Sequence, residues 1–271
     1  MVEMMSSCTQ LYELILYSSR LFSLGPHDLE QIESLVTSSS WKIRSLRLME
    51  CSSQSPILYE LLSVFPDVQF LVLGIELSAA PPLWTPAVEL YELKLHRTLP
   101  SEVLVWLLSS SRQSLRILEL RDLPSASTAL DLVPCFPNLQ SLRLMRFNSH
   151  SAAILLQCAN LVELVLLNVP TIFPLPPLPA SLQHLYLPIQ TYSTGIDIES
   201  VLRAVNSDNL PNLRILSFTG ASDQASPLQA ACLSKNINFR ASPSKSWTND
   251  DPVKTLHFPR RKSISNFLLM R

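Results

Sequence analysis

The chain has 271 residues, of which 47% are hydrophobic and 16% charged, so it can bury one large continuous core. Its formal net charge of -1 hides an uneven distribution, because residues 240–271 carry seven Lys and Arg against two Asp, whereas the rest carries 14 against 20 acidic residues. Only four glycines occur, which argues against glycine-rich phosphate or dinucleotide loops, since these need the close backbone approach that glycine allows.

A short leucine motif recurs along the chain and predicts the fold. The pattern L-x-x-L-x-L, with other apolar residues in some copies, begins at residues 11, 43, 68, 90, 115, 139, 161, 182 and 213. Its clearest copies are Leu115–Leu120, Leu139–Leu144 and Leu161–Leu166, at intervals of 24 and 22 residues, the period of a leucine-rich repeat. We therefore predict an α/β leucine-rich-repeat solenoid (horseshoe) of about nine repeats, with a parallel β-sheet on the concave face. Ile237–Phe239 is a candidate tenth strand.

The connections between these strands differ in their proline content. Apolar residues at helical spacing predict short helices on the convex face over Asp28–Ser39, Ile57–Phe65, Ser101–Ser109, Thr128–Cys135 and Ser149–Ala159. Two other connections, Ala79–Pro86 and Ile172–Pro179, are too rich in proline for a helix, because proline lacks the backbone N–H. We expect these proline-rich returns to be extended or tightly turned.

The repeat pattern ends near residue 240. This predicts two regions, a repeat domain over residues 1–240 and a basic, mostly disordered tail over residues 241–271. In the tail, Arg260-Arg261-Lys262-Ser263 fits a nuclear-import signal or a phosphorylation site at Ser263, and it also fits solvated disordered chain.

Residues that alternate with the motif leucines should point away from the core, onto the concave face. We place the candidate binding site for a protein ligand on this face. Its residues are Arg47, Phe70, Lys94, His96, Glu119, Arg121, Arg143, Val165, Leu167, Tyr186 and Ile215.

Two features of this site each have two interpretations. Lys94, Glu119 and Arg143 occupy the middle position of successive strands with alternating charge, and they form either a recognition patch or a self-neutralising ladder. Downstream we expect an exposed apolar area formed by Val165, Leu167, Tyr186 and Ile215. An exposed apolar area favours a partner site, unless the tail folds over it.

Signatures of catalysis and of metal binding are missing from the sequence. The usual hydrolase, zinc-protease, P-loop and EF-hand motifs do not occur, so we predict no enzyme activity, no cofactor and no metal site. A pair formed by Glu92 and His96 could do acid–base work, but it lacks a nucleophile and an orienting third group. The five cysteines are far apart and form no C-x-x-C motif, which favours buried reduced thiols over zinc ligands or disulfides.

The sequence also favours a cytoplasmic or nuclear location. It has no signal-peptide pattern at its start, no apolar run of membrane-spanning length and no N-x-S/T sequon. Aromatic residues do not interleave with the basic ones, and an acidic body repels phosphate. We therefore expect neither nucleic acid nor a membrane as a partner.

Four of the repeats carry a family resemblance. Their segments resemble the irregular leucine-rich repeats of F-box/leucine-rich-repeat proteins, and the large fungal set in particular: Trp41–Cys51 (WKIRSLRLMEC), Ser114–Leu120 (SLRILEL), Pro137–Leu144 (PNLQSLRL) and Pro211–Phe218 (PNLRILSF). The resemblance covers about residues 8–240, and Cys51 stands where such repeats often carry Cys or Asn.

This resemblance implies the substrate-binding part of a ubiquitin ligase. In that family an N-terminal F-box docks on a Skp-type adaptor of a cullin-RING ligase, and the concave repeat face receives the substrate. Here the first repeat begins at Leu11, so the chain is either a truncated product or a module that binds partners without recruiting a ligase. The alternatives are a structural or regulatory repeat scaffold of the GTPase-activating kind, and a hydrolase hidden in a repeat scaffold.

Overall fold

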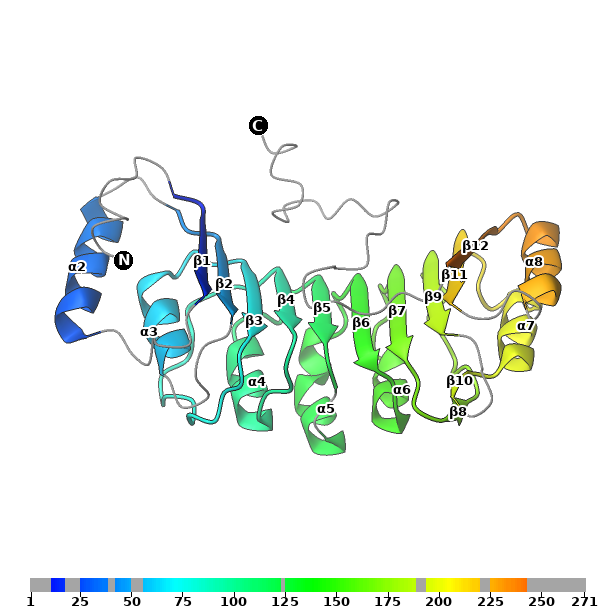
Figure 1. Cartoon of the computed structure of the whole chain (residues 1–271), viewed down its shortest axis with the longest axis horizontal. Coiled ribbons are helices and arrows are strands. Elements are labelled where there is room, and N and C mark those ends of the chain that lie inside the picture. The colour runs from blue at the N-terminus through cyan, green and yellow to red at the C-terminus, as the bar shows by residue number, and fades with distance from the viewer. Residues whose placement is uncertain are drawn as a thin grey trace. The chain divides into compact units, whose positions relative to one another are not determined.

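A computed structural model describes residues 11–17, 25–38, 42–49, 56–122, 125–188, 194–219 and 225–242. These residues fall into two compact units, one ending at Leu115 and the other beginning at Arg116. Each unit is an α/β structure built on parallel strands (Figure 1).

Among the described residues of the first unit, four strands pair in chain order. They are β1 (Glu13–Tyr17), β2 (Ser45–Met49), β3 (Phe70–Gly74) and β4 (Glu92–Leu95), all parallel. Its helices are α2 (Pro26–Ser38), α3 (Ile57–Val64) and α4 (Ser101–Leu108).

In the part of the second unit that the structure describes, six strands also pair in chain order and in parallel. They are β5 (Ile117–Leu120), β6 (Ser141–Arg146), β7 (Glu163–Asn168), β9 (His184–Pro188), β11 (Ile215–Thr219) and β12 (Asn238–Ser242). Its helices are α5 (Ala126–Leu132), the short 3-10 turn η1 (Val133–Cys135), α6 (Ser149–Leu155), α7 (Ile198–Asn206) and α8 (Ala225–Ser234). A separate two-stranded parallel pair joins β8 (Ile172–Phe173) to β10 (Gly195–Ile196).

The leucine motif sets where each strand begins. Every strand from β1 to β11, apart from the two-residue β8 and β10, starts at the third residue of a motif copy. The fourth motif residue is fully buried in both units, as Leu46, Leu93, Leu118, Leu142 and Leu164 all have 0% exposure. The predicted strands and the inward direction of their leucines are therefore confirmed.

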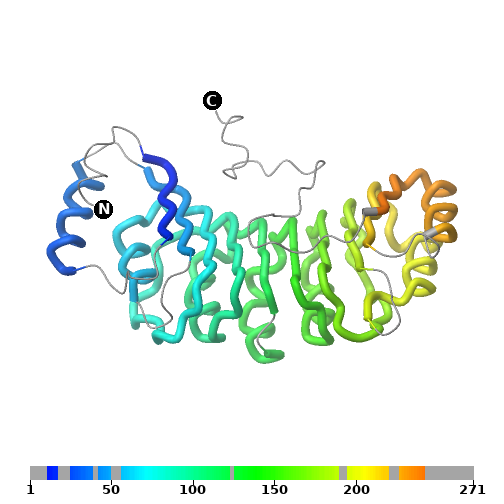
Figure 2. The backbone as a smooth tube through the Cα atoms, in the orientation of Figure 1, coloured from blue at the N-terminus to red at the C-terminus, as the bar shows by residue number. Residues whose placement is uncertain are grey.

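Parallel neighbours require a connection that returns along one side of the sheet. In the second unit α5 and α6 lie on the same side of β5, β6 and β7, and Figure 2 shows the chain returning there after each strand. Three helices of this unit begin where a side chain accepts a hydrogen bond from the backbone N–H three residues later, at Ser125, Asn148 and Asp197. The leucines of the strands pack against this helix-bearing side.

The predicted contrast between helical and proline-rich connections is also confirmed. Helices α2 to α6 occupy the five connections where they were expected, and neither Ala79–Pro86 nor Pro174–Pro179 is helical. In the first unit the Tyr59 hydroxyl donates to the carbonyl of Ala79 at 2.7 Å, and Trp106 Nε1 donates to that of Trp84 at 2.7 Å. These bonds fix the first return against α3 and α4.

Other expectations need a correction or lie beyond the described residues. The candidate tenth strand exists as β12, but it runs to Ser242, so Ala241 and Ser242 belong to the sheet and not to the tail. Cys51, Ser263 and the rest of the tail lie outside the described residues. Within the described ranges, no helix combines the length and apolar character needed to cross a membrane.

Candidate functional site

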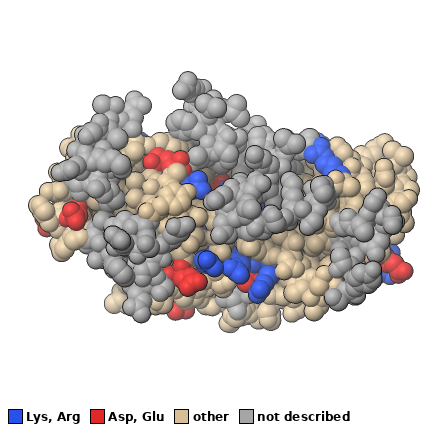
Figure 3. Space-filling model, in the orientation of Figure 1, with Lys and Arg blue, Asp and Glu red and all other residues tan. Residues whose placement is uncertain are grey.

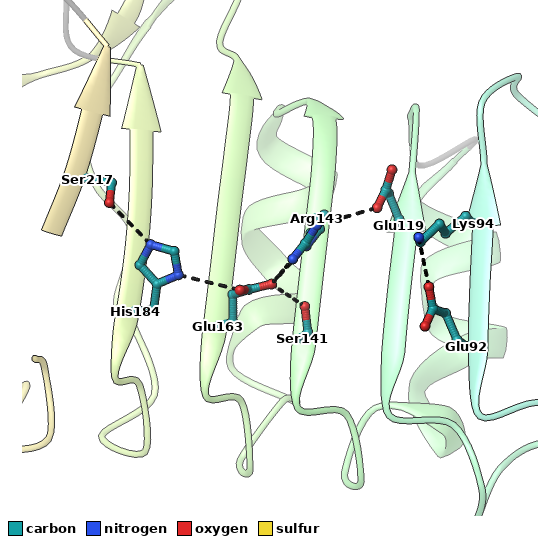
Figure 4. A network of polar contacts seen from close by, with 8 residues as sticks. All are labelled: Glu92, Lys94, Glu119, Ser141, Arg143, Glu163, His184 and Ser217. Atoms are coloured by element: carbon teal, nitrogen blue, oxygen red, sulfur yellow. Dashed lines mark hydrogen bonds and ion pairs between the residues drawn. The ribbon is translucent and has the colours of Figure 1, made fainter. Parts of the chain in front are cut away.

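The face of the sheet opposite the helices carries the candidate site, because side chains alternate along a strand. In the second unit this face has three rows of side chains, one row for each outward position of the motif. Figure 4 shows side chains of the first two rows in front of the strands, with helices behind them. The rows differ in chemistry.

The first row is centred on the carboxylate of Glu163. Its Oε1 accepts hydrogen bonds from Ser141 Oγ at 2.6 Å and from Arg143 Nε at 2.8 Å, and Arg143 Nη2 lies 2.7 Å away. The side chains of Arg143 and Glu163 are only 1% and 2% exposed. This is a buried arginine–carboxylate pair in which two guanidinium N–H groups converge on one carboxylate oxygen, with a serine as a third donor to it.

Arg143 also faces a second carboxylate, in the middle row. Its Nη1 lies 3.8 Å from Glu119 Oε2, on the neighbouring strand β5. Arg143 therefore carries the positive charge between two buried carboxylates, and Glu163 is the nearer of the two.

This arrangement determines the ionisation of Glu163. Burial alone would raise its pKa, but the Arg143 charge, the hydrogen bonds from His184 and Ser141 and the His184 charge outweigh burial. Together they hold the pKa of Glu163 well below its usual range. Glu163 is thus a carboxylate throughout the neutral pH range.

His184, on β9, links Glu163 on β7 to Ser217 on β11. Its Nδ1 lies 3.4 Å from Glu163 Oε2, and its Nε2 lies 3.3 Å from Ser217 Oγ on β11. A carboxylate only accepts hydrogen bonds, so Nδ1 donates to it, and in the neutral ring Nε2 accepts from the Ser217 hydroxyl.

The order serine, histidine, carboxylate is also that of a hydrolase triad, but the surroundings differ. The strand that holds Ser217 pairs on both sides, with β9 and with β12, so its backbone groups are engaged in the ladder. An oxyanion hole needs free N–H groups aimed at one point beside the nucleophile. The paired part of β11 thus offers no free N–H beside Ser217, and the network runs as a polar ladder across β6, β7, β9 and β11.

The third row lies at the carboxyl ends of the strands and is the accessible one. Its members alternate with the last motif leucine of each strand, and all are partly exposed: Arg121, Met145, Leu167, Pro188 and Thr219. The row continues the parallel arrangement, since the backbone N–H of Arg146 donates to the carbonyl of Arg121 at 2.8 Å. A partner that approached this face could reach the third row directly.

The first unit carries a smaller polar set on its own sheet. Lys94 Nζ lies 2.9 Å from Glu92 Oε1, so the expected charged position is neutralised by a residue of its own strand. Burial raises the pKa of Glu13, and this effect exceeds the opposing influence of Arg47 and of Ser45. Phe70 is buried, with its ring 5.9 Å from that of Tyr91.

The expected exposed apolar area is wrong. Val165 is 0% exposed, Tyr186 6% and Ile215 8%, whereas Leu167 alone of the four is partly exposed. Val165 lies in register between Arg143 and Tyr186, and parallel strands bring such neighbours to about 4.8 Å, so large side chains on both sides cover it. His96 is likewise buried, at 8% exposure.

Four residues of the network were not among the predicted site residues: Ser141, Glu163, His184 and Ser217. Three of them share a signal that was present in the sequence, because Ser141, Glu163 and His184 each occupy the third place of a motif copy. The register that joins Ser141 to Glu163 and Glu163 to His184 follows from aligning the copies.

No protein-family model matches the chain, and no curated protein matches it. Neither comparison assigns the chain to a family.

Metal ligands do not gather on either sheet as far as the structure is described: no group of three or more His, Cys, Asp and Glu side chains is placed to hold an ion. Cys135, Cys158 and Cys232 are buried free thiols. Burial raises the pKa of Cys158 to about 12 and that of Cys232 to about 11.

These thiols should be unreactive in the folded chain. Burial leaves very little of the Cys158 thiol ionised near neutral pH, and the thiolate is the species that is alkylated. We expect iodoacetamide to leave the peptides of Cys158 and Cys232 unmodified until denaturant is added, as measured by mass spectrometry. Rapid modification of either cysteine without denaturant would contradict the burial described above.

A pH series should reveal the low pKa of Glu163. In the unfolded chain a glutamate has a pKa of about 4.3, above the pKa of Glu163 in the folded network. The stability that this carboxylate contributes is thus fully present above about pH 5 and is lost as the pH falls through the folded pKa. We expect the urea midpoint of the native chain to exceed that of Glu163→Gln at neutral pH, and the difference to shrink in acid. A difference that persisted unchanged to about pH 3 would contradict the assignment.

Proposed function

We propose that the chain is a leucine-rich-repeat solenoid that binds a protein partner on the helix-free face of its sheet. The observation that supports this most strongly is the constant start of each strand at the third motif residue, with strands paired in chain order within each unit. A doubly wound fold would place helices on both faces and reverse its strand order at one point. A repeat array builds each strand beside the previous one.

In this proposal the first two rows form a rigid base and the third row makes contact. The carboxylate of Glu163 makes its hydrogen bonds and its ion pair within the buried network. The network therefore fixes the positions of these side chains but presents little charge to a partner. The third row offers Leu167 and Met145 for apolar contact and Arg121 for a carboxylate. A protein surface with an apolar centre and an acidic edge fits this composition.

The charge distribution favours a protein over nucleic acid. On the side drawn in Figure 3, acidic and basic side chains of the described residues lie close together among uncharged ones. Nucleic-acid binding needs a wide field of positive charge. We accordingly propose a non-enzymatic interaction module of the cytoplasm or nucleus.

A capture experiment with matched variants tests this proposal. Leu167→Glu places a charge in the third row, whereas Leu130→Glu places the same charge on α5, at a leucine that is 72% exposed on the helix side. We expect the native chain and Leu130→Glu to retain a stoichiometric protein from an extract of the source cells. Leu167→Glu should retain about tenfold less. Equal retention by both variants, with both folded by circular dichroism, would refute the role of this face.

The same capture separates the two versions of the proposal. If the chain acts as the receptor part of a ubiquitin ligase, a Skp-type adaptor and a cullin accompany the retained protein. If it acts as a repeat scaffold, the partner is retained without them.

A further inference from the structure

The connection from β7 to β9 is unlike the others in the second unit. The connections that contain α5, α6, α7 and α8 return through a helix, whereas this one returns through Pro174-Leu175-Pro176-Pro177-Leu178-Pro179. Four of these six residues are prolines, which cannot donate to a helix or a sheet and hold φ near the polyproline II value. None of Pro174–Pro179 lies in a helix or strand.

The exposure of this segment repeats every three residues. From Pro174 onward, Pro174, Pro177 and Ala180 are exposed, whereas Leu175, Pro176, Leu178 and Pro179 are half-buried. A polyproline II helix has three residues per turn, so residues three apart lie along one edge. The observed period is the one expected if Pro174–Pro179 is a polyproline II helix with one edge toward solvent and another against the protein.

Both ends of the segment are anchored. At the start, β8 pairs with β10, the ring of Phe173 lies 5.4 Å from that of Phe147, and the backbone N–H of Leu175 donates to Ser200 Oγ at 2.8 Å. At the end, the backbone N–H of Leu182 donates to the carbonyl of Pro179 at 3.1 Å. The segment is therefore anchored at both ends before any partner arrives.

We propose that Pro174–Pro179 is a docking site for a domain that recognises polyproline II helices through a groove of aromatic side chains. Such grooves bind exposed proline-rich segments because the ligand loses little conformational entropy on binding. The occupant we infer is of the WW type. The chain carries no Asp, Glu, Lys or Arg from Leu164 to Ile196, so recognition must come from apolar side chains, chiefly the exposed Pro174 and Pro177, and not from a charged anchor. This site is separate from the third row of the sheet and does not depend on the function proposed for it.

The other proline-rich return does not have these properties. Pro86 is buried, Leu83 and Trp84 separate it from Pro81 and Pro82, and the carbonyl of Trp84 accepts from Trp106. No three-residue period of exposure runs through Ala79–Pro86.

A titration of the full chain with a purified WW domain selected for Pro-Pro-Leu-Pro ligands tests the proposal. We expect saturable binding, weakened about tenfold or more by Pro177→Ala and by Pro174→Ala. Pro211→Ala, which changes an exposed proline in a turn before β11, should alter the affinity by less than about twofold. A synthetic peptide of residues 172–180 should compete, but less tightly than the chain, because it is not held extended.

Three results would overturn the proposal. In the first, the native chain does not bind the WW domain. In the second, Pro177→Ala and Pro211→Ala bind it equally well. In the third, the chain binds only an SH3 domain whose groove carries acidic residues. Thermal unfolding of each variant distinguishes lost docking from lost folding. A variant whose melting temperature equals that of the native chain but that fails to bind supports the proposal. If Pro177→Ala were unfolded, Pro174→Ala, at the other exposed proline of the segment, would carry the test.

Discussion

Replacing Arg143 by Leu should lower the free energy of unfolding by about 3–5 kcal/mol, the largest effect we expect from any single change on the helix-free face. Arg143 lies 2.7 Å from Glu163 and 3.8 Å from Glu119, and all three side chains are at most 2% exposed. Its removal leaves two buried carboxylates without their shared cation. Chemical unfolding in urea near neutral pH measures the loss.

Two further variants make this test specific. Lys235→Ala removes an exposed ion pair with Asp208, whose side chain is 100% exposed, and should change the stability by less than about 0.5 kcal/mol. Arg143→Leu combined with Glu163→Gln should be less destabilised than the two single losses added together, because the pair is then removed as a unit. Strictly additive losses would mean that the two side chains do not interact as described.

Replacing Leu164 by Ala should cost about 2–5 kcal/mol. Leu164 is 0% exposed and lies in register between Leu142 and Leu185, so the shortened side chain leaves a cavity among leucines that cannot easily close. The urea midpoint should fall accordingly.

The matched change at an exposed leucine should have almost no effect on stability. Leu130 on α5 is 72% exposed, and Leu130→Ala should alter the free energy of unfolding by less than about 0.5 kcal/mol. Equal effects at Leu130 and Leu164 would mean that the motif leucines do not form the core.

The positions of the strands could be predicted because one physical pattern repeats. Leucines at the fourth and sixth motif places must face a core, and alternation then fixes the direction of every residue between them. The proline-rich returns were equally predictable, since Pro81, Pro82 and Pro86 lack the N–H that a helix needs.

Helices α7 and α8 were not predicted. For α7 the sequence contained a usable signal, because Asp197 accepts a hydrogen bond from the backbone N–H of Ser200 and caps the helix. The interval between the motif copies that begin at residues 182 and 213 is also the longest but one, which leaves room for a helix.

The polar network was less predictable than the fold, for a reason of geometry. The sequence places Arg143 beside residues of both neighbouring strands, but it does not say which carboxylate lies nearer. In the structure the diagonal partner Glu163 is at 2.7 Å, while Glu119, its neighbour in register, is at 3.8 Å. Exposure was mispredicted for a related reason, since alternation gives the face of Val165 but not the size of the side chains beside it.

Contacts among leucine methyl groups test the central claim, the parallel register of the motif copies, most directly. In the chain labelled at leucine methyls, NMR should show cross-peaks from Leu118 to Leu142, from Leu142 to Leu164 and from Leu164 to Leu185, in that order along the sheet. A soluble paramagnetic probe should leave these signals intact. Missing cross-peaks, together with strong broadening of the same methyls by the probe, would contradict the fold and the binding face built on it.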